Sequence, residues 1–247
     1  MKTLQFSDKI DLAEWQLIAG GASRDVYVHD DYPEIVLKVI RENRRGPNGE
    51  KRLRSRRKFY RHIRRFGAYL SFSREFDEFL EQARRFSGDE DVALPIARIY
   101  GFIHTTRGLG MLVERLRGPS GETAPTIRDV LRKHGPQPWV FELVDECFEV
   151  MRKHHIVMAD CSPDNFVLTG DGKGGQRIVC IDGTGDKSAI HIYAVSGTLN
   201  ALKLKRYRKR LQDTIDAFVV SEGLSVIDEE LAAQAQDPSR DASRQTV

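Results

Sequence analysis

The chain has 247 residues, of which 30% are charged and 40% hydrophobic, and its formal net charge is +3. This composition is typical of a globular protein and argues against a disordered chain. The sequence contains no apolar run of the about 18 residues that a membrane-spanning helix needs. Its N-terminus lacks the apolar core of a signal peptide. Three cysteines indicate free thiols in a reducing compartment. We therefore expect a cytoplasmic protein with one two-lobed unit or one large domain.

The first part of the chain predicts short strands. Segments 14–19 and 25–29 flank Gly20 and Gly21, and the β-branched segment 34–40 carries Lys38 in its middle. A lysine in a buried strand is unfavourable unless it meets an anion. Lys38 is therefore either a contact for phosphate and carboxylate groups or an edge-strand lysine that points to solvent.

Residues 41–65 are densely basic, and they carry an apolar stripe at helical spacing from Leu53 onward. One interpretation is a solvated helix that docks on the domain through this stripe. The other is a surface for an anionic partner, namely acidic phospholipid, lipopolysaccharide phosphate or, less favoured, nucleic acid. The basic residues that define this surface begin at Arg41 and end at Arg65.

Further elements divide the chain into two lobes. A helix over 73–86 offers Glu75 and Glu78 as inward carboxylates, and the glycines at 118 and 121 mark the boundary between the lobes. We expect an N-lobe over 1–117, a C-lobe over 118–222 and a tail over 223–247 with a disordered end. The expected strands of the second half of the N-lobe are 97–104 and 109–116. The expected C-lobe elements are helices over 127–134, 139–154 and 199–220 and strands over 166–168 and 178–181.

One stretch of the C-lobe has the spacing of a phosphoryl-transfer centre. Asp160 and Asn165 are five residues apart, and Asp182 follows two short apolar strands joined by a glycine-rich turn. Each residue alone is typical of a turn, because Asp and Asn side chains bond their local backbone. The joint pattern favours a catalytic loop.

These motifs resemble those of the protein-kinase-like superfamily, and within it the chain resembles the bacterial YrbL family of PhoP regulatory network proteins. The resemblance covers roughly residues 15–210, and its marks are GGASRDVYVH, SREF, SPDNFVL and IVCIDGTGD. It implies an α+β fold of two lobes, with a five-stranded sheet and a long helix in the N-lobe and a minimal helical C-lobe.

The resemblance also implies roles for individual residues. Asp160 would accept the proton of the acceptor hydroxyl, and Asn165 and Asp182 would be the ligands of Mg²⁺. Lys38 would contact the phosphates of ATP and pair with Glu75, or with Glu78 one turn later. The residues that would bind the nucleotide are Gly20, Gly21, Val26, Lys38, Glu75, Glu114 and Leu116.

The chain departs from the kinase pattern at several positions. The glycine-rich phosphate loop retains only Gly21, because Ala19 and Arg24 stand at the other two glycine positions. Met158 and Ala159 replace the usual His-Arg, and no long activation segment follows Asp182. A platform for peptide substrates is therefore not expected, which favours a sugar, lipid or small-molecule hydroxyl as acceptor.

Three functions follow as hypotheses. The first is an ATP- and Mg²⁺-dependent phosphotransferase with a non-protein acceptor. The second is a pseudokinase, a regulatory module that binds nucleotide in an envelope or stress response. The third is a protein that binds an anionic surface through its basic residues 41–65, which is compatible with either of the others.

Overall fold

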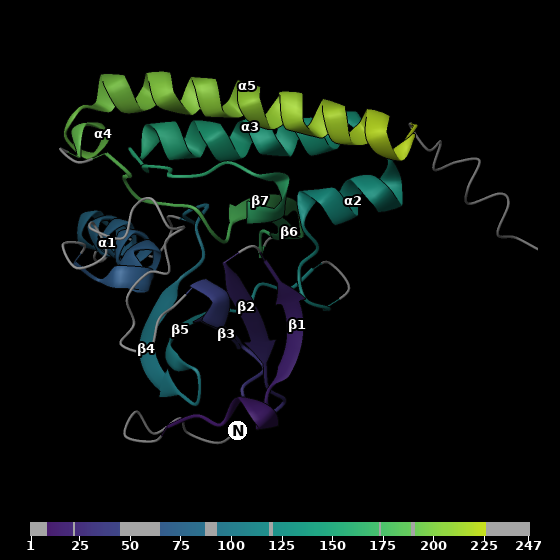
Figure 1. Ribbon diagram of the computed structural model, residues 1–247. Coiled ribbons are helices and arrows are strands. Elements are labelled where there is room, and N and C mark those ends of the chain that lie inside the picture. The colour runs from purple at the N-terminus through teal and green to yellow at the C-terminus, as the bar shows by residue number, and fades with distance from the viewer. Residues whose placement is uncertain are drawn as a thin grey trace, which may run out of the picture.

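The computed structural model describes residues 9–21, 23–44, 65–86, 93–118, 121–172, 174–188 and 191–225. The β-sheet of the N-lobe lies at one end of the molecule, and the helices α3 and α5 lie side by side at the other (Figure 1). Helix α1 flanks the sheet, and the hairpin of β6 and β7 lies between the two lobes (Figure 1).

The N-lobe is built on one antiparallel sheet with the strand order β1-β2-β3-β5-β4. Its central strand β3 is rich in β-branched residues, which suit a pleated and buried surface. In the register of the sheet, Lys38 lies opposite Val26 on one side and Met111 on the other. The elements are η1 (Leu12–Glu14), β1 (Gln16–Gly20), β2 (Arg24–Val28), β3 (Ile35–Ile40), η2 (Glu42–Arg44), η4 (Gly67–Tyr69), α1 (Leu70–Arg85), β4 (Ile99–Thr105) and β5 (Gly108–Glu114).

The C-lobe helices begin and end where local chemistry dictates. Thr126 and Asp129 form a capping box at the start of α2, and Pro138 occupies the first turn of α3. Gly223 ends α5 in the left-handed conformation, which favours glycine. The elements are α2 (Ile127–His134), α3 (Pro138–Lys153), η5 (Pro163–Asn165), β6 (Phe166–Gly170), β7 (Gln176–Cys180), α4 (Ile192–Val195) and α5 (Gly197–Glu222).

A buried apolar cluster joins the lobes. Val167 and Val179 of the β6–β7 hairpin pack with Met111 and Val113 of β5 and with Phe72 of α1. All five residues are less than 9% exposed. The two lobes therefore share part of their core.

The predicted α+β fold with the protein-kinase-like order of elements is confirmed: a sheet with one helix between its third and fourth strands precedes a helical lobe with a hairpin. The short helix α4 was not predicted, because its four residues are too few for a period to appear. All three cysteines are buried and free, as expected. Within the residues that the structure describes, we find no helix with the length and apolar character needed to cross a membrane.

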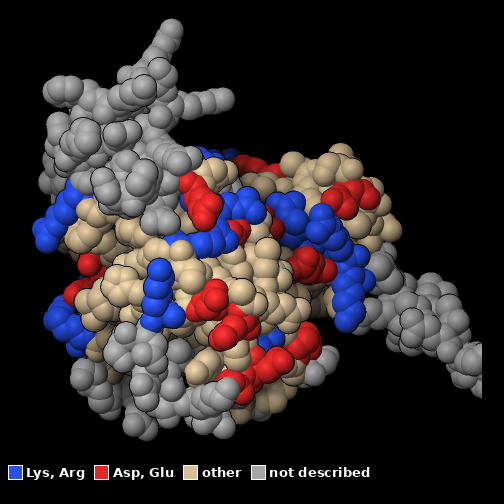
Figure 2. Space-filling model, turned by 60° about the horizontal axis from the view of Figure 1, so that its bottom comes forward, with Lys and Arg blue, Asp and Glu red and all other residues tan. Residues whose placement is uncertain are grey.

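The predicted basic surface falls almost wholly outside the described residues, which include only 41–44 and 65 of its range. On the face shown in Figure 2, basic and acidic side chains of the described residues are interspersed. The anionic-partner hypothesis therefore stays a prediction, as does the disordered tail, of which only 223–225 are described.

Candidate active site

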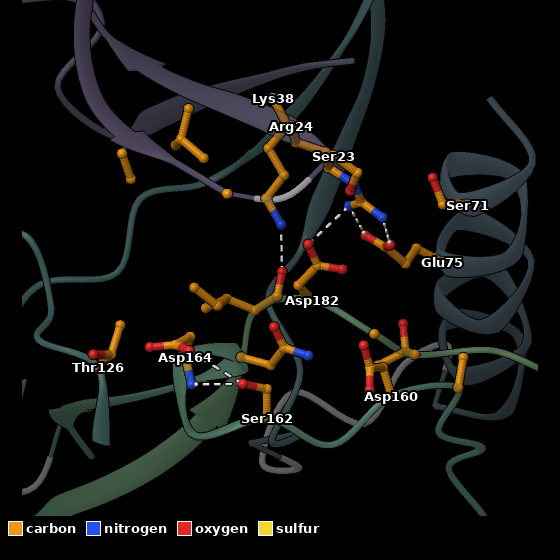
Figure 3. A pocket seen from close by; sticks show the side chains of 18 of the residues that line it. Ser23, Arg24, Lys38, Ser71, Glu75, Thr126, Asp160, Ser162, Asp164 and Asp182 are labelled. Atoms are coloured by element: carbon orange, nitrogen blue, oxygen red, sulfur yellow. Dashed lines mark hydrogen bonds and ion pairs between the residues drawn. The ribbon is translucent and has the colours of Figure 1, made fainter. Parts of the chain in front are cut away.

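A cleft of about 760 Å³ lies between the lobes. It is lined by Gly20 and Gly21 of the predicted phosphate loop and by the loop over 159–165, called the catalytic loop here after its predicted role. Asp160, Asn165 and Asp182 face it from the C-lobe, and Lys38 and Glu75 face it from the N-lobe. Figure 3 shows the labelled members of this set around one space. The structure thus brings together residues that are more than 140 positions apart in sequence, as the motif predicts.

Backbone hydrogen bonds hold the catalytic loop against the segment that follows β7. The carbonyl of Gly183 accepts the backbone N–H groups of Ala159 and Asp160, at 2.7 and 2.9 Å. The backbone N–H of Ile181 donates to the carbonyl of Asn165 at 2.8 Å. Gly183 has φ of +83°, and a Cβ on it would lie 2.9 Å from the carbonyl oxygen of Asp160. Glycine is therefore required for this close contact.

Asp160 is exposed to the cleft and keeps one carboxylate oxygen open. Its Oδ1 accepts the N–H of Cys161 at 2.9 Å. Among the described residues, its other oxygen has no hydrogen-bond partner. A carboxylate with one oxygen anchored and the other open has the geometry of a general base.

Asn165 and Asp182 have the chemistry to hold Mg²⁺. Both offer hard oxygen donors, and Mg²⁺ is usually bound by one or two protein groups together with phosphate oxygens and water. The side chain of Asn165 lies against Gly183, next to Asp182, because a Cβ on that glycine would lie 3.0 Å from its Nδ2. The side chain of Asp182 is 32% exposed, so one of its oxygens can reach a ligand in the cleft. The residues present therefore fit the ion.

Arg24 is the unexpected member of the site. Its guanidinium donates to both carboxylate oxygens of Glu75, and its Nη1 lies 3.1 Å from Oδ2 of Asp182. Figure 3 shows the guanidinium between these two carboxylates. Burial alone would lower the pKa of Arg24, but the charges of Glu75 and Asp182 outweigh it and raise that pKa.

The predicted pair between Lys38 and Glu75 is not formed. Among the described residues, Glu75 and Asp182 form ion pairs with Arg24 and none with Lys38. The ammonium of Lys38 instead donates to the backbone carbonyl of Ile181 (Figure 3). The reason is geometric: the planar fork of an arginine matches both oxygens of a carboxylate, whereas an ammonium is a point charge.

Glu78, the alternative partner for Lys38, has a different role. Its Oε1 accepts from Nε2 of Gln82 at 2.7 Å and from the backbone N–H of Val157 at 3.1 Å. Val157 lies three residues before Asp160. Glu78 therefore holds the start of the catalytic loop, which the spacing of the two glutamates could not reveal.

Helix α1 also contacts the segment after Asp182 directly. Gly185 has φ of +92°, and a Cβ on it would collide with the carbonyl oxygen of Arg74 and lie 2.8 Å from its carbonyl carbon. The backbone N–H of Gly185 donates to the carbonyl of Val157 at 2.7 Å. Together with Arg24–Glu75 and Glu78–Val157, this contact ties α1 to the cleft at three points.

Burial of Glu78 predicts a pH dependence of stability. Burial raises the pKa of Glu78 from its ordinary 4.5 to about 6, although Gln82 and Val157 donate hydrogen bonds to it and Arg85 lies nearby. A raised pKa means that the folded state binds the proton more tightly. The stabilisation is full below pH 4.5 and is lost as the pH rises through 6. Between pH 4.5 and 7, we expect the free energy of unfolding to fall by about 2 kcal/mol more in the wild type than in Glu78→Gln.

Urea unfolding of both proteins across this range measures the difference. Glu149→Gln on α3 is the control, because a hydrogen bond from Arg152 lowers the pKa of Glu149 and its titration lies below the range. Equal pH slopes for the wild type and Glu78→Gln would contradict the assignment.

The remaining predicted nucleotide contacts divide into two groups. Gly20, Gly21 and Val26 line the cleft. Gly20 leaves room for the side chain of Arg41, because a Cβ would lie 2.7 Å from its Nη2. Leu116 does not line this cleft; it is 9% exposed and packs in the apolar cluster between the lobes.

Glu114, the other predicted hinge residue, also lies outside the lining of the cleft. Its backbone N–H donates to the carbonyl of Arg98 at 2.9 Å, and its carboxylate accepts the N–H of Arg98 at 3.2 Å. Both hydrogen bonds join the end of β5 to the residue that precedes β4. The open part of the site is thus the side predicted to bind phosphates, and the side predicted to bind adenine is packed.

Sequence reasoning missed several residues that line the cleft. Arg24 entered only as a mismatch to the glycine pattern, although a second cation on a buried strand beside Lys38 was a usable signal. Thr126, Arg128 and Asp164 also line the cleft, and Arg128 pairs with Asp164 at 2.8 Å. Asp164 lies within the SPDNFVL motif, but no role was assigned to it, and no motif marked Thr126 or Arg128, which the start of α2 brings to the cleft by tertiary packing.

Solved structures similar to this chain are protein kinase domains. A double mutant of the Mycobacterium tuberculosis PknI kinase domain is 16% identical over 73% of this chain and 64% of that one, with a TM-score of 0.35. The BubR1 kinase domain is 15% identical over 74% of this chain and 50% of that one, with a TM-score of 0.41. The chain thus spans less than two thirds of the length of these domains. No curated protein matches the sequence.

The family described as PhoP regulatory network protein YrbL matches residues 10–215. This range covers the sheet of the N-lobe, the C-lobe up to residue 215 within α5, and every residue of the candidate site described above. The chain belongs to the YrbL family of PhoP regulatory network proteins.

Proposed function

We propose that this chain is an ATP- and Mg²⁺-dependent phosphotransferase that acts on a sugar, lipid or small-molecule hydroxyl. The observation that carries the proposal is that Asp160, Asn165 and Asp182 line one cleft opposite Lys38. Phosphoryl transfer needs a base for the hydroxyl, oxygen ligands for the metal and a cation for the phosphates. The cleft contains a residue for each of these needs.

The step itself follows from these positions. The open oxygen of Asp160 takes the proton of the acceptor hydroxyl, whose oxygen bonds to the γ-phosphorus of ATP while the bond to the β–γ bridging oxygen breaks. ADP leaves with that oxygen. Lys38 holds the phosphates in line, and Asn165 and Asp182 would hold the metal. Bound Mg²⁺ would neutralise the charge on the phosphate oxygens.

A non-protein acceptor is favoured by the shape of the C-lobe. The segment after Asp182 turns at Gly185 directly against α1, so its course leaves little chain to form a peptide-docking platform there. The acceptor would enter beside Asp160, where the cleft is open. Ser71 of α1 also lines the cleft and offers a hydroxyl group to a small polar ligand.

Thermal unfolding with ATP, with and without Mg²⁺, tests the proposal. At a nucleotide concentration about 100 times Kd, we expect the wild-type Tm to rise by about 5–10 °C when Mg²⁺ is present. Asp182→Ala should lose the part of the shift that depends on Mg²⁺. Asp213→Ala, which removes an exposed carboxylate of α5, should keep it. A wild-type Tm that does not change on addition of ATP, either with or without Mg²⁺, would count against the proposal.

One observation favours a pseudokinase as the second candidate. Arg24 lies 3.1 Å from Oδ2 of Asp182 and so engages one oxygen of a predicted metal ligand. In a pseudokinase, nucleotide would raise the Tm but no ADP would form with any acceptor. Detection of ADP that depends on Asp160 separates the two functions.

A further inference from the structure

The cleft contains two buried cations where the kinase resemblance implies one. Arg24 is 6% exposed and Lys38 is 4% exposed, and both line the same space. Their partners differ: Arg24 faces side-chain carboxylates, whereas Lys38 donates to a backbone carbonyl. This difference in partners indicates different roles.

Arg24 connects three separate parts of the site. It belongs to β2, its two-pronged hydrogen bond reaches Glu75 on α1, and its ion pair reaches Asp182 after β7. Its guanidinium also lies over the ring of Phe72, 5.1 Å from the ring centroid. Phe72 and Glu75 are three residues apart on α1 and therefore share a face. Because Phe72 and Glu75 hold the Arg24 side chain from one turn of α1 and Asp182 holds it from the C-lobe, Arg24 has little freedom to move toward a ligand.

Lys38, unlike Arg24, keeps hydrogen-bond donors free for a ligand. Its one hydrogen bond within the described residues is to the carbonyl of Ile181, the residue before Asp182. An ammonium has three donors, so two remain for a ligand at the cleft surface. No carboxylate of the described residues forms a direct salt bridge with it, although its charge acts to lower the pKa values of Asp182 and Glu75. An anionic ligand therefore need not break a direct ion pair to reach it.

We propose that Arg24 is a positioning residue: it fixes Glu75 of α1, and it fixes Asp182 beside the catalytic loop. Lys38 is then the cation that remains to bind the phosphates of the ligand. The proposal rests on the proposed function for the identity of that ligand. The sequence resemblance implies that Lys38 alone contacts both Glu75 and the phosphates. In this proposal, Arg24 makes the contact with Glu75 and Lys38 makes the contact with the phosphates.

Double-mutant cycles on urea unfolding test the first half without any ligand. The Arg24→Met and Glu75→Gln cycle is expected to show a coupling of about tenfold or more in the unfolding equilibrium constant. The matched Lys38→Met and Glu75→Gln cycle should be additive within about twofold. If Arg24→Met does not fold, Arg24→Lys replaces it, since a lysine cannot form the two-pronged bond. A larger coupling for Lys38 than for Arg24 overturns the proposal.

Calorimetric titration with inorganic tripolyphosphate tests the second half. Lys38→Met should raise the Kd by about tenfold or more, whereas Arg24→Lys should stay within about threefold of the wild type. In turnover assays, Arg24→Lys should then lower kcat with little change in KM, because it disturbs position and not binding. A merely structural Arg24 would leave kcat unchanged in a folded variant, and that result overturns the positioning role.

The experiments distinguish a failure of the roles assigned to Arg24 and Lys38 from a failure of the phosphotransferase proposal. If the wild type binds neither tripolyphosphate nor ATP, the phosphotransferase proposal fails and so does the role of Lys38, while the cycles still decide the role of Arg24. If the ligands bind but Arg24→Lys weakens them more than Lys38→Met does, only the division of roles is overturned.

Discussion

Replacing Asp160 by asparagine is expected to reduce ADP formation by about 10²–10⁴-fold, the usual contribution of a general base. Asparagine has the same shape and keeps an oxygen to accept the N–H of Cys161, so the loop should stay folded. It cannot take the proton of the acceptor hydroxyl. The measurement is the rate of ADP release at saturating ATP and Mg²⁺ with a sugar or lipid acceptor, and the Tm of the variant should equal that of the wild type.

Asp164→Asn is the matched control for this prediction. Asp164 is an exposed aspartate four residues later that also lines the cleft, but its carboxylate is held by Arg128 at 2.8 Å and by Ser162. We expect its turnover to stay within about threefold of the wild type, because it is not placed to take the proton. A wild-type rate in Asp160→Asn would show that this residue is not the base.

Gly185→Ala is expected to lower the free energy of unfolding by about 2–6 kcal/mol. Part of the loss comes from the backbone, because φ of +92° disfavours any residue with a Cβ, by about 1–3 kcal/mol. The rest comes from the collision of that Cβ with the carbonyl of Arg74, since forced overpacking typically destabilises by about 1–3 kcal/mol. Urea unfolding measures the sum.

Gly174→Ala separates the two terms. Gly174 has φ of +96°, almost the same as Gly185, but a Cβ on it would meet nothing within 4 Å. Gly174→Ala should therefore lower the free energy of unfolding only by the backbone contribution, about 1–3 kcal/mol. Equal losses in the two variants would mean that α1 shifts freely away from Gly185, contrary to the close packing of the helix on this segment.

The sequence predicts the frame of the fold well because its signals are local. Strand β3 is β-branched and apolar over most of its length, and α2 begins with a capping box and ends at Gly135. The aspartate–asparagine spacing at 160 and 165 places both residues on one short loop between helix α3 and the β6–β7 hairpin. Signals of this kind need no knowledge of distant residues.

The pairing inside the site could not be predicted, because it depends on distant contacts. Arg24 and Glu75 are separated by 51 positions, and nothing in either neighbourhood indicates the other. Glu75 and Glu78 share a helix face, so their spacing allows either one to meet a cation. Only the packed structure shows that one binds a guanidinium and the other binds the backbone of Val157.

The three ties of α1 have a consequence for how this protein could be controlled. A switch needs an element with two arrangements of similar free energy. For α1 to swing outward, the chain would have to break a buried charged pair, release the N–H of Val157 and open the contact at Gly185 together. Helix α1 is therefore held against the cleft by contacts that must all break together, so it is a poor candidate for a two-state switch.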